Sequence, residues 1–132
     1  MYNKHMIDIQ KQVIYWRDSS IEDWQVASEL IKSGHIRHGL FFLQLALEKL
    51  LKAHVCNRTR DLAPRIHNLV RLAEIAKLEL SPDQLDLIAE MNAFNIEGRY
   101  PDRALPILTM EEATTYLSRA KEVYEWLKSQ LL

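Results

Sequence analysis

Apolar residues recur along most of this chain at spacings of three and four, which is the period of an α-helix. The first such stretch runs from about Ile7 to Ser33. Its apolar positions share one helical face: Ile9, Val13, Trp16, Trp24, Ala27 and Ile31. Because this stripe stays in phase across Ser19 and Ser20, we expect one continuous helix, with a break capped by Ser20 as the alternative. Gly34 should end the helix, since glycine tolerates a left-handed backbone.

The second stretch, from His38 to Asn57, is apolar almost all the way round. A helix with apolar residues on every side is expected to be mostly buried. A polar, basic loop containing Pro64 follows it, and we expect this loop to face solvent. A shorter helix is then predicted from Ile66 to about Ala76, because apolar positions again return on one side.

Two later helices are marked by their first residues. Ser81, Pro82 and Gln84 form a capping box with proline at the first helical position, and that helix should run to about Phe94. Thr109 and Glu112 repeat the capping box and open the last helix. The apolar stripe of the last helix is expected to pack against another helix: Ala113, Leu117, Ala120, Tyr124, Leu127 and Leu131.

These elements predict an all-α fold, an up-and-down bundle of four to five helices, because no segment shows the strict alternation of a strand with hairpin turns. A length of 132 residues suits a single domain spanning 1–132 and is too short for two comfortable cores. The irregular stretch from Asn95 to Leu108 is longer than a simple connection needs. It is therefore a candidate functional loop, with disorder as the alternative.

Composition narrows the classes of function. Seventeen Lys and Arg against eighteen Asp and Glu give a net charge of -1, so any nucleic-acid contact must use a local basic patch. The single Cys56 excludes an internal disulfide and suits a cytoplasmic location, where it acts as a small hydrophobe. No uncharged apolar run approaches the roughly 20 residues that span a bilayer, and the amino terminus does not resemble a secretion signal.

Three polar residues stand out within the apolar second helix. Gln44, Glu48 and Lys52 follow one another at intervals of four, so their side chains lie on one face. Polar groups on a buried face need partners. The arrangement therefore indicates a cleft, a partner subunit, or an internal ion pair, for which Glu48 before Lys52 is the favourable order.

Four sequence pieces together resemble the HEPN (higher eukaryotes and prokaryotes nucleotide-binding) domain family. They are W-x7-W-x2-A-x2-L-I in the first helix, Q-L-A-L-E-K-L-L-K-A in the second, I-H-N-L-V-R-L-A entering the third, and G-R-Y-P-D before the last. The resemblance implies a homodimeric helical bundle with a role around nucleotides or RNA. It also implies a possible partner, a minimal nucleotidyltransferase, in a toxin–antitoxin pair.

For the binding site, the resemblance puts Gln44, Glu48 and Lys52 near a cleft between helices. There Lys52 and Arg99 would bind phosphate, and Tyr100 would stack on a base. The alternative is structural: Arg99 would pair with Glu97 or Asp102, Tyr100 would pack beneath Pro101, and His67 would cap its helix. Nothing resembles a glycine-rich phosphate loop, and no cofactor is expected.

Many HEPN proteins are ribonucleases, whose motif places an Arg, a polar residue and then a His at or before the last helix. Here Arg99 and Arg103 are followed by no histidine. A literal match, Arg60 and Asp61 followed by His67, lies in the loop before the third helix. His67 and Arg99 are thus the candidate catalytic residues of a metal-independent ribonuclease, the first alternative function.

A purely structural protein-interaction module is the second alternative. The spacing of His35 and His38 permits metal binding, but no cysteine or carboxylate lies close by in sequence, so no metal site is expected. The three tryptophans are expected in the core or at a dimer seam rather than stacked on bases.

Overall fold

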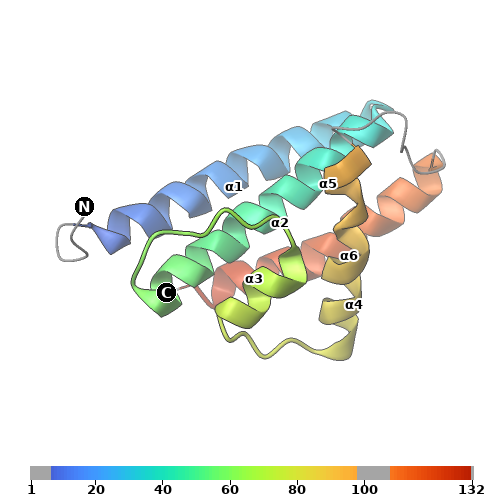
Figure 1. The fold of residues 1–132 in the computed structure, drawn as a ribbon. Coiled ribbons are helices and arrows are strands. Elements are labelled where there is room, and N and C mark those ends of the chain that lie inside the picture. Colours follow the sequence, from blue (N-terminus) through green and yellow to red (C-terminus); the bar gives the residue numbers. More distant parts are fainter. Residues whose placement is uncertain (1–6, 98–107, 132) are drawn as a thin grey trace.

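The computed structural model describes residues 7–97 and 108–131, and Figure 1 shows how their helices are arranged. Within these ranges the chain forms six helical segments and no strand: α1 (Ile9–Lys32), α2 (Ile36–Thr59), α3 (Leu69–Ile75), α4 (Pro82–Met91), α5 (Ala93–Glu97) and α6 (Met110–Ser129). The prediction of an all-α bundle is confirmed. Helices α1, α2 and α6 form the main bundle, and the shorter helices pack across it (Figure 1).

The first two helices form an antiparallel hairpin. Helix α1 passes through both serines without a break, which confirms the continuous helix. The buried Ser20 hydroxyl donates to the Ala46 carbonyl of α2 at 2.6 Å, so a polar side chain inside the helix has a partner across the hairpin. Gly34 has a φ of +89°, the left-handed conformation predicted for the residue that ends α1.

Gly39 sets how closely the hairpin packs. A Cβ added there would lie 2.5 Å from Cγ1 of Ile31 and 3.0 Å from the Ile31 backbone nitrogen. No side chain fits at that distance without movement of α1. The absence of a side chain at Gly39 therefore lets the two backbones approach closely. This contact sets the register of α2 along α1.

Helix α2 runs through the centre of the core. Most of its residues are buried, as its all-round apolar pattern predicted. Leucines on several of its faces pack against the other helices, and among the fully buried residues are Leu40, Leu43, Leu47, Leu50 and Leu51. The predicted stripe of α6 is also buried at Ala113, Ala120, Tyr124 and Leu127. Polar side chains on α2 are consequently held in a tightly packed setting.

Two predicted helix boundaries are wrong. Helix α3 begins at Leu69 rather than Ile66, because Asn68 is its N-cap and accepts the Arg71 amide at 3.0 Å. His67 therefore does not cap the helix. Helix α4 ends at Met91 rather than near Phe94, and the next residue, Asn92, accepts the Leu69 amide at 2.8 Å. A local cap thus sets the start of α3, and one long-range hydrogen bond joins that start to the end of α4.

Candidate functional site

Gln44, Glu48 and Lys52 form a connected chain of contacts on one face of α2. The Gln44 amide donates to Oε1 of Glu48 at 3.3 Å, and Nζ of Lys52 lies 3.1 Å from Oε2 of the same carboxylate. All three residues are buried, with exposed fractions of 0%, 3% and 6%. Of the three arrangements open from sequence, the structure shows the internal ion pair.

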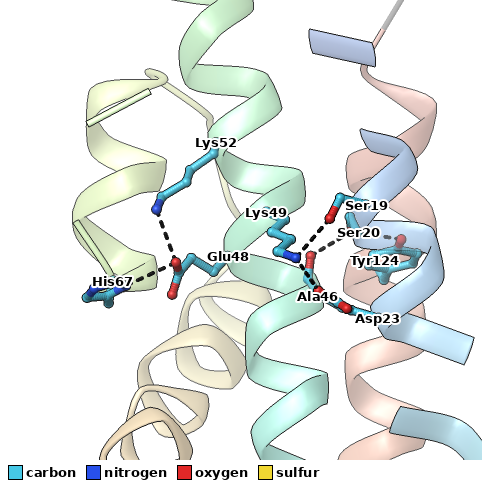
Figure 2. A network of polar contacts seen from close by, with 9 residues as sticks. All are labelled: Ser19, Ser20, Asp23, Ala46, Glu48, Lys49, Lys52, His67 and Tyr124. Atoms are coloured by element: carbon cyan, nitrogen blue, oxygen red, sulfur yellow. Dashed lines mark hydrogen bonds and ion pairs between the residues drawn. The ribbon is translucent and has the colours of Figure 1, made fainter. Parts of the chain in front are cut away.

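We call Gln44, Glu48 and Lys52 the ladder. A loop residue outside α2 contacts it. Nδ1 of His67 lies 3.1 Å from Oε2 of Glu48 (Figure 2). The His67 carbonyl accepts from the Gln44 amide at 3.3 Å. Two residues one helical turn apart thus hold both the ring and the backbone of His67. Its side chain remains 44% exposed, so this polar cluster opens to solvent through an imidazole.

The cluster also has unused hydrogen-bonding capacity. The Lys52 ammonium lies 5.2 Å from the centre of the Trp16 ring, a cation–π distance, and Glu48 is its one hydrogen-bonding partner among the described residues. Of the buried side-chain atoms without a hydrogen-bond partner in the described part of the chain, two belong to residues of this cluster, namely Oε1 of Gln44 and Nε1 of Trp16. Buried polar atoms usually have a hydrogen-bond partner, so these two atoms are suited to a hydrogen bond with a water or a ligand.

A second polar network lies on the opposite side of α2 (Figure 2). Lys49 pairs with Asp23 of α1 at 2.7 Å and donates to the Ser19 hydroxyl at 2.8 Å. Beside them, Tyr124 of α6 lies 2.9 Å from the Ser20 hydroxyl. Since Ser20 uses its own hydrogen on the Ala46 carbonyl, Tyr124 is the donor in that contact.

The core around Tyr124 explains its protonation state. Its ring stacks on Trp24 with 4.4 Å between centroids, and burial raises the pKa of its phenol to about 12. Nearby, Nε2 of the buried His54 lies 2.8 Å from the Leu127 carbonyl near the end of α6, and burial lowers the pKa of His54. Both groups are therefore neutral near pH 7, and we assign them to the scaffold.

Sequence reasoning found three members of the ladder but gave His67 the wrong neighbour. The structural alternative had His67 cap a helix, whereas its ring contacts Glu48, nineteen residues earlier. The Lys49 network was missed altogether. The signal available was the paired placement of Gln44 and Glu48 on a buried face, which required an outside partner without naming it.

Two predicted ligand-binding residues, Arg99 and Tyr100, lie outside the described residues, as does Arg103. The literal ribonuclease match can be placed. Arg60 is the C-cap of α2, twelve positions beyond Glu48, which corresponds to about 18 Å of helix. Because His67 lies against Glu48, the structure does not bring Arg60 and His67 together.

The remaining candidate chemistries are limited by burial and spacing. Cys56 is buried, and desolvation raises the pKa of its thiol to about 11, so it is not a reactive thiolate near neutral pH. Among residues 7–97 and 108–131, no group of three or more His, Cys, Asp or Glu side chains is placed to hold a metal ion. No helix in those ranges has the length and apolar content needed to cross a bilayer.

Comparison with known proteins identifies the family. The family model described as HEPN domain matches residues 13–130. The chain is similar to TT1696 from Thermus thermophilus, with 20% identity, a TM-score of 0.76, and coverage of 91% of this chain and 98% of that one. It is also similar to ST0689, an archaeal HEPN homologue, with 21% identity, a TM-score of 0.69 and the same coverage. None of the curated proteins compared with it matches. The matched helices include the whole ladder of α2, and the chain belongs to the HEPN domain family.

Proposed function

We propose that this HEPN domain binds a nucleotide or a segment of RNA beside the ladder of Gln44, Glu48 and Lys52. Arg99 and Tyr100 complete the proposed site, as a phosphate-binding guanidinium and a base-stacking ring. The protein is proposed to act in the cytoplasm as a homodimer. Its proposed partner is a minimal nucleotidyltransferase, in a toxin–antitoxin pair.

The observation that carries this proposal is that the Lys52 ammonium has more hydrogen-bond donors than it has partners among the described residues. A buried ion pair is rarely more stabilising than apolar side chains of the same volume. In a helix otherwise filled with leucine, stability alone gives little reason to keep Gln44, Glu48 and Lys52. The ammonium has three hydrogens and one hydrogen-bonding partner in the described chain, which leaves donors for a phosphate oxygen.

The test is calorimetric titration with ATP, GTP and a short RNA. Lys52→Met and Arg99→Ala should each weaken binding of the preferred ligand at least tenfold, the effect of losing one charge-assisted hydrogen bond. Lys49→Met is the matched control, because it removes an ammonium from the same helix on the side that faces Asp23. Equal affinities in all four proteins, or no binding by the parent, would contradict the proposal.

The partner is tested separately. Co-expression with a nucleotidyltransferase encoded beside this chain should give a complex that co-purifies at a fixed ratio. A neighbouring reading frame without the nucleotidyltransferase pattern, or a partner that elutes separately, would contradict this part of the proposal. Partner binding without any nucleotide or RNA binding would favour the interaction-module alternative.

One contact favours a second function, metal-independent RNA cleavage. A carboxylate that holds an imidazole, as Glu48 holds His67, is an arrangement used to orient a general base. Such a base would take the proton of a ribose 2′-hydroxyl as its oxygen attacks the adjacent phosphate, and an acid would protonate the departing 5′-oxygen. Cleavage of RNA by the parent, lost in His67→Ala and Arg99→Ala, would support this function, and intact RNA would contradict it.

A further inference from the structure

Helix α4 packs across α6 on the outside of the main bundle (Figure 1). A hollow of about 380 Å³ lies there, lined by three carboxylates, Asp83 and Asp86 from α4 and Glu122 from α6. None of the three forms an ion pair with another described residue. Arg119 of the same lining is held by Glu90 through contacts of 3.1 and 2.8 Å, which lower the pKa of the Glu90 carboxyl. The hollow therefore presents uncompensated negative charge to solvent.

The bottom of this hollow is apolar. Leu87 of α4 and Val123 of α6 also line it, and they are only 1% and 4% exposed. Carbon atoms at the bottom and carboxylates around them match the side chain of a lysine or arginine. Such a side chain packs its alkyl stem on apolar surface and keeps its charged end in a polar setting.

A second hollow, of about 460 Å³, continues along α6 toward its first turn. Glu111 and Glu112 line it, and Arg119 belongs to the lining of both hollows. Tyr116 donates to Glu90 at 3.0 Å, so the same carboxylate holds the tyrosine and the arginine. The two hollows thus form one groove, which a fixed Arg119 divides.

The helix starts beside these hollows do not make them anion sites. The Ser81 hydroxyl accepts the Gln84 amide at the start of α4, and the Thr109 hydroxyl accepts the Glu112 amide at the start of α6. These capping bonds use first-turn amides that an anion would need. The carboxylates around them repel an anion, so the groove suits a cation.

We propose that this acidic groove, formed by the two hollows on either side of Arg119, docks a basic segment of a partner protein. One lysine or arginine side chain of the segment enters each hollow, and an uncharged residue lies over Arg119, which repels a third cation. A polyamine, whose charges follow one uninterrupted chain, fits this division less well than a peptide. The inference goes beyond the proposed function, because it uses α4 and α6 instead of the Lys52 cluster and needs no nucleotide.

The test is fluorescence anisotropy with a labelled peptide of alternating arginine and serine residues, at several salt concentrations. Asp86→Asn/Glu122→Gln removes a charge from each helix that lines the first hollow and should weaken binding roughly fivefold, the effect of losing two exposed charge pairs. Added salt should weaken peptide binding by the parent more than by this variant. Circular dichroism confirms that each variant is folded.

Glu22→Gln/Glu29→Gln is the matched control, because it removes two exposed carboxylates from α1. It should bind the peptide as tightly as the parent does. Amide shifts in a nitrogen-15 NMR spectrum report the location of binding, and the peptide should move those of residues 83–87 and 119–123. A peptide of the same composition with its arginines in one block should bind more weakly.

Four results would overturn the inference. They are no peptide binding by the parent, equal losses in the groove and control variants, amide shifts confined to other helices, and spermine binding as tight as that of the alternating peptide. The last of these would assign the groove to a polyamine. The proposed function is judged separately, by whether ATP, GTP or RNA binding depends on Lys52 and Arg99.

Discussion

The two polar networks on opposite sides of α2 are built from similar residues but end differently. The Lys49 network joins α1 and α2, and the neighbouring contacts of Ser20 extend to α6. The Lys52 network starts from the same helix and ends in a half-exposed histidine on a loop. Charged residues of one helix can thus serve either as a brace to another helix or as a support for a surface group, and the identity of the last partner distinguishes the two.

The largest effect should come from Glu48→Ala, which removes the central carboxylate of the Lys52 network. Lys52 would become an unpaired buried cation, a loss of about 3–5 kcal/mol in the free energy of unfolding. Urea denaturation measures this loss. Glu48→Ala combined with Lys52→Met should recover most of it, because no uncompensated charge remains. Equal stabilities for the single and double variants would show that the ion pair is not what Glu48 stabilises.

Gly39→Ala should disturb the packing of α1 against α2, which also carries the Lys49 network. The added Cβ would meet Ile31 at 2.5 Å, so α1 must move away from α2. Overpacking of this kind costs about 1–3 kcal/mol, and the better helix propensity of alanine returns up to about 1 kcal/mol. Thermal unfolding checks the expected net loss. An unchanged or higher melting temperature would mean that the helices are not held at this close distance.

Tyr124→Phe, beside the Lys49 network, should have a smaller effect on the free energy of unfolding. It removes the hydroxyl that donates to Ser20 and keeps the ring that stacks on Trp24. The expected loss is about 1 kcal/mol, because Ser20 keeps its bond to the Ala46 carbonyl. Tyr116→Phe, which removes a more exposed hydroxyl bonded to Glu90, is the control and should cost less. A larger loss from Tyr116→Phe would reverse the ranking of the two sites.

The smallest effect near neutral pH concerns His54, the buried counterpart of His67. Burial lowers the pKa of folded His54 below its ordinary value of 6.5, so the unfolded chain takes up the proton first. The stability contributed by neutral His54 is therefore present above pH 6.5 and is lost as the pH falls from 6.5 toward the folded pKa. Urea denaturation between pH 7 and pH 5 measures this change.

His54→Gln supplies the control for the pH effect. Its amide can still donate to the Leu127 carbonyl but does not titrate, so stability should depend less on pH in this variant. A variant whose stability falls with pH as steeply as that of the parent would assign the effect to another group.

Local signals predicted the helix starts well. The capping boxes of Ser81 with Gln84 and of Thr109 with Glu112 are both present, because each lies within four consecutive residues. The start of α3 also has a local signal, because Asn68 accepts the Arg71 amide three residues later, but the apolar periodicity from Ile66 pointed to an earlier start. Gln44 and Asn92 further hold residues 67–69 from other helices, and no periodicity in the sequence reports such contacts.

The candidate site was predictable only in part, for the same reason. The spacing of Gln44, Glu48 and Lys52 placed them on one face, since helical geometry alone determines that relation. The meeting of His67 with Glu48, and of Lys49 with Asp23, depends on how the chain folds back. A fixed helical spacing does not encode such a contact.

The close α1–α2 hairpin also bears on the order of folding. Its contacts join neighbours in sequence, and contacts of this kind form early because little chain must be closed into a loop. Residues 9–59 can therefore pair before the later helices arrive. In such a hairpin, Glu48 and Lys52 still face solvent on the side where His67 comes to lie. Docking of the α2–α3 connection then encloses the ion pair and sets the imidazole beside it.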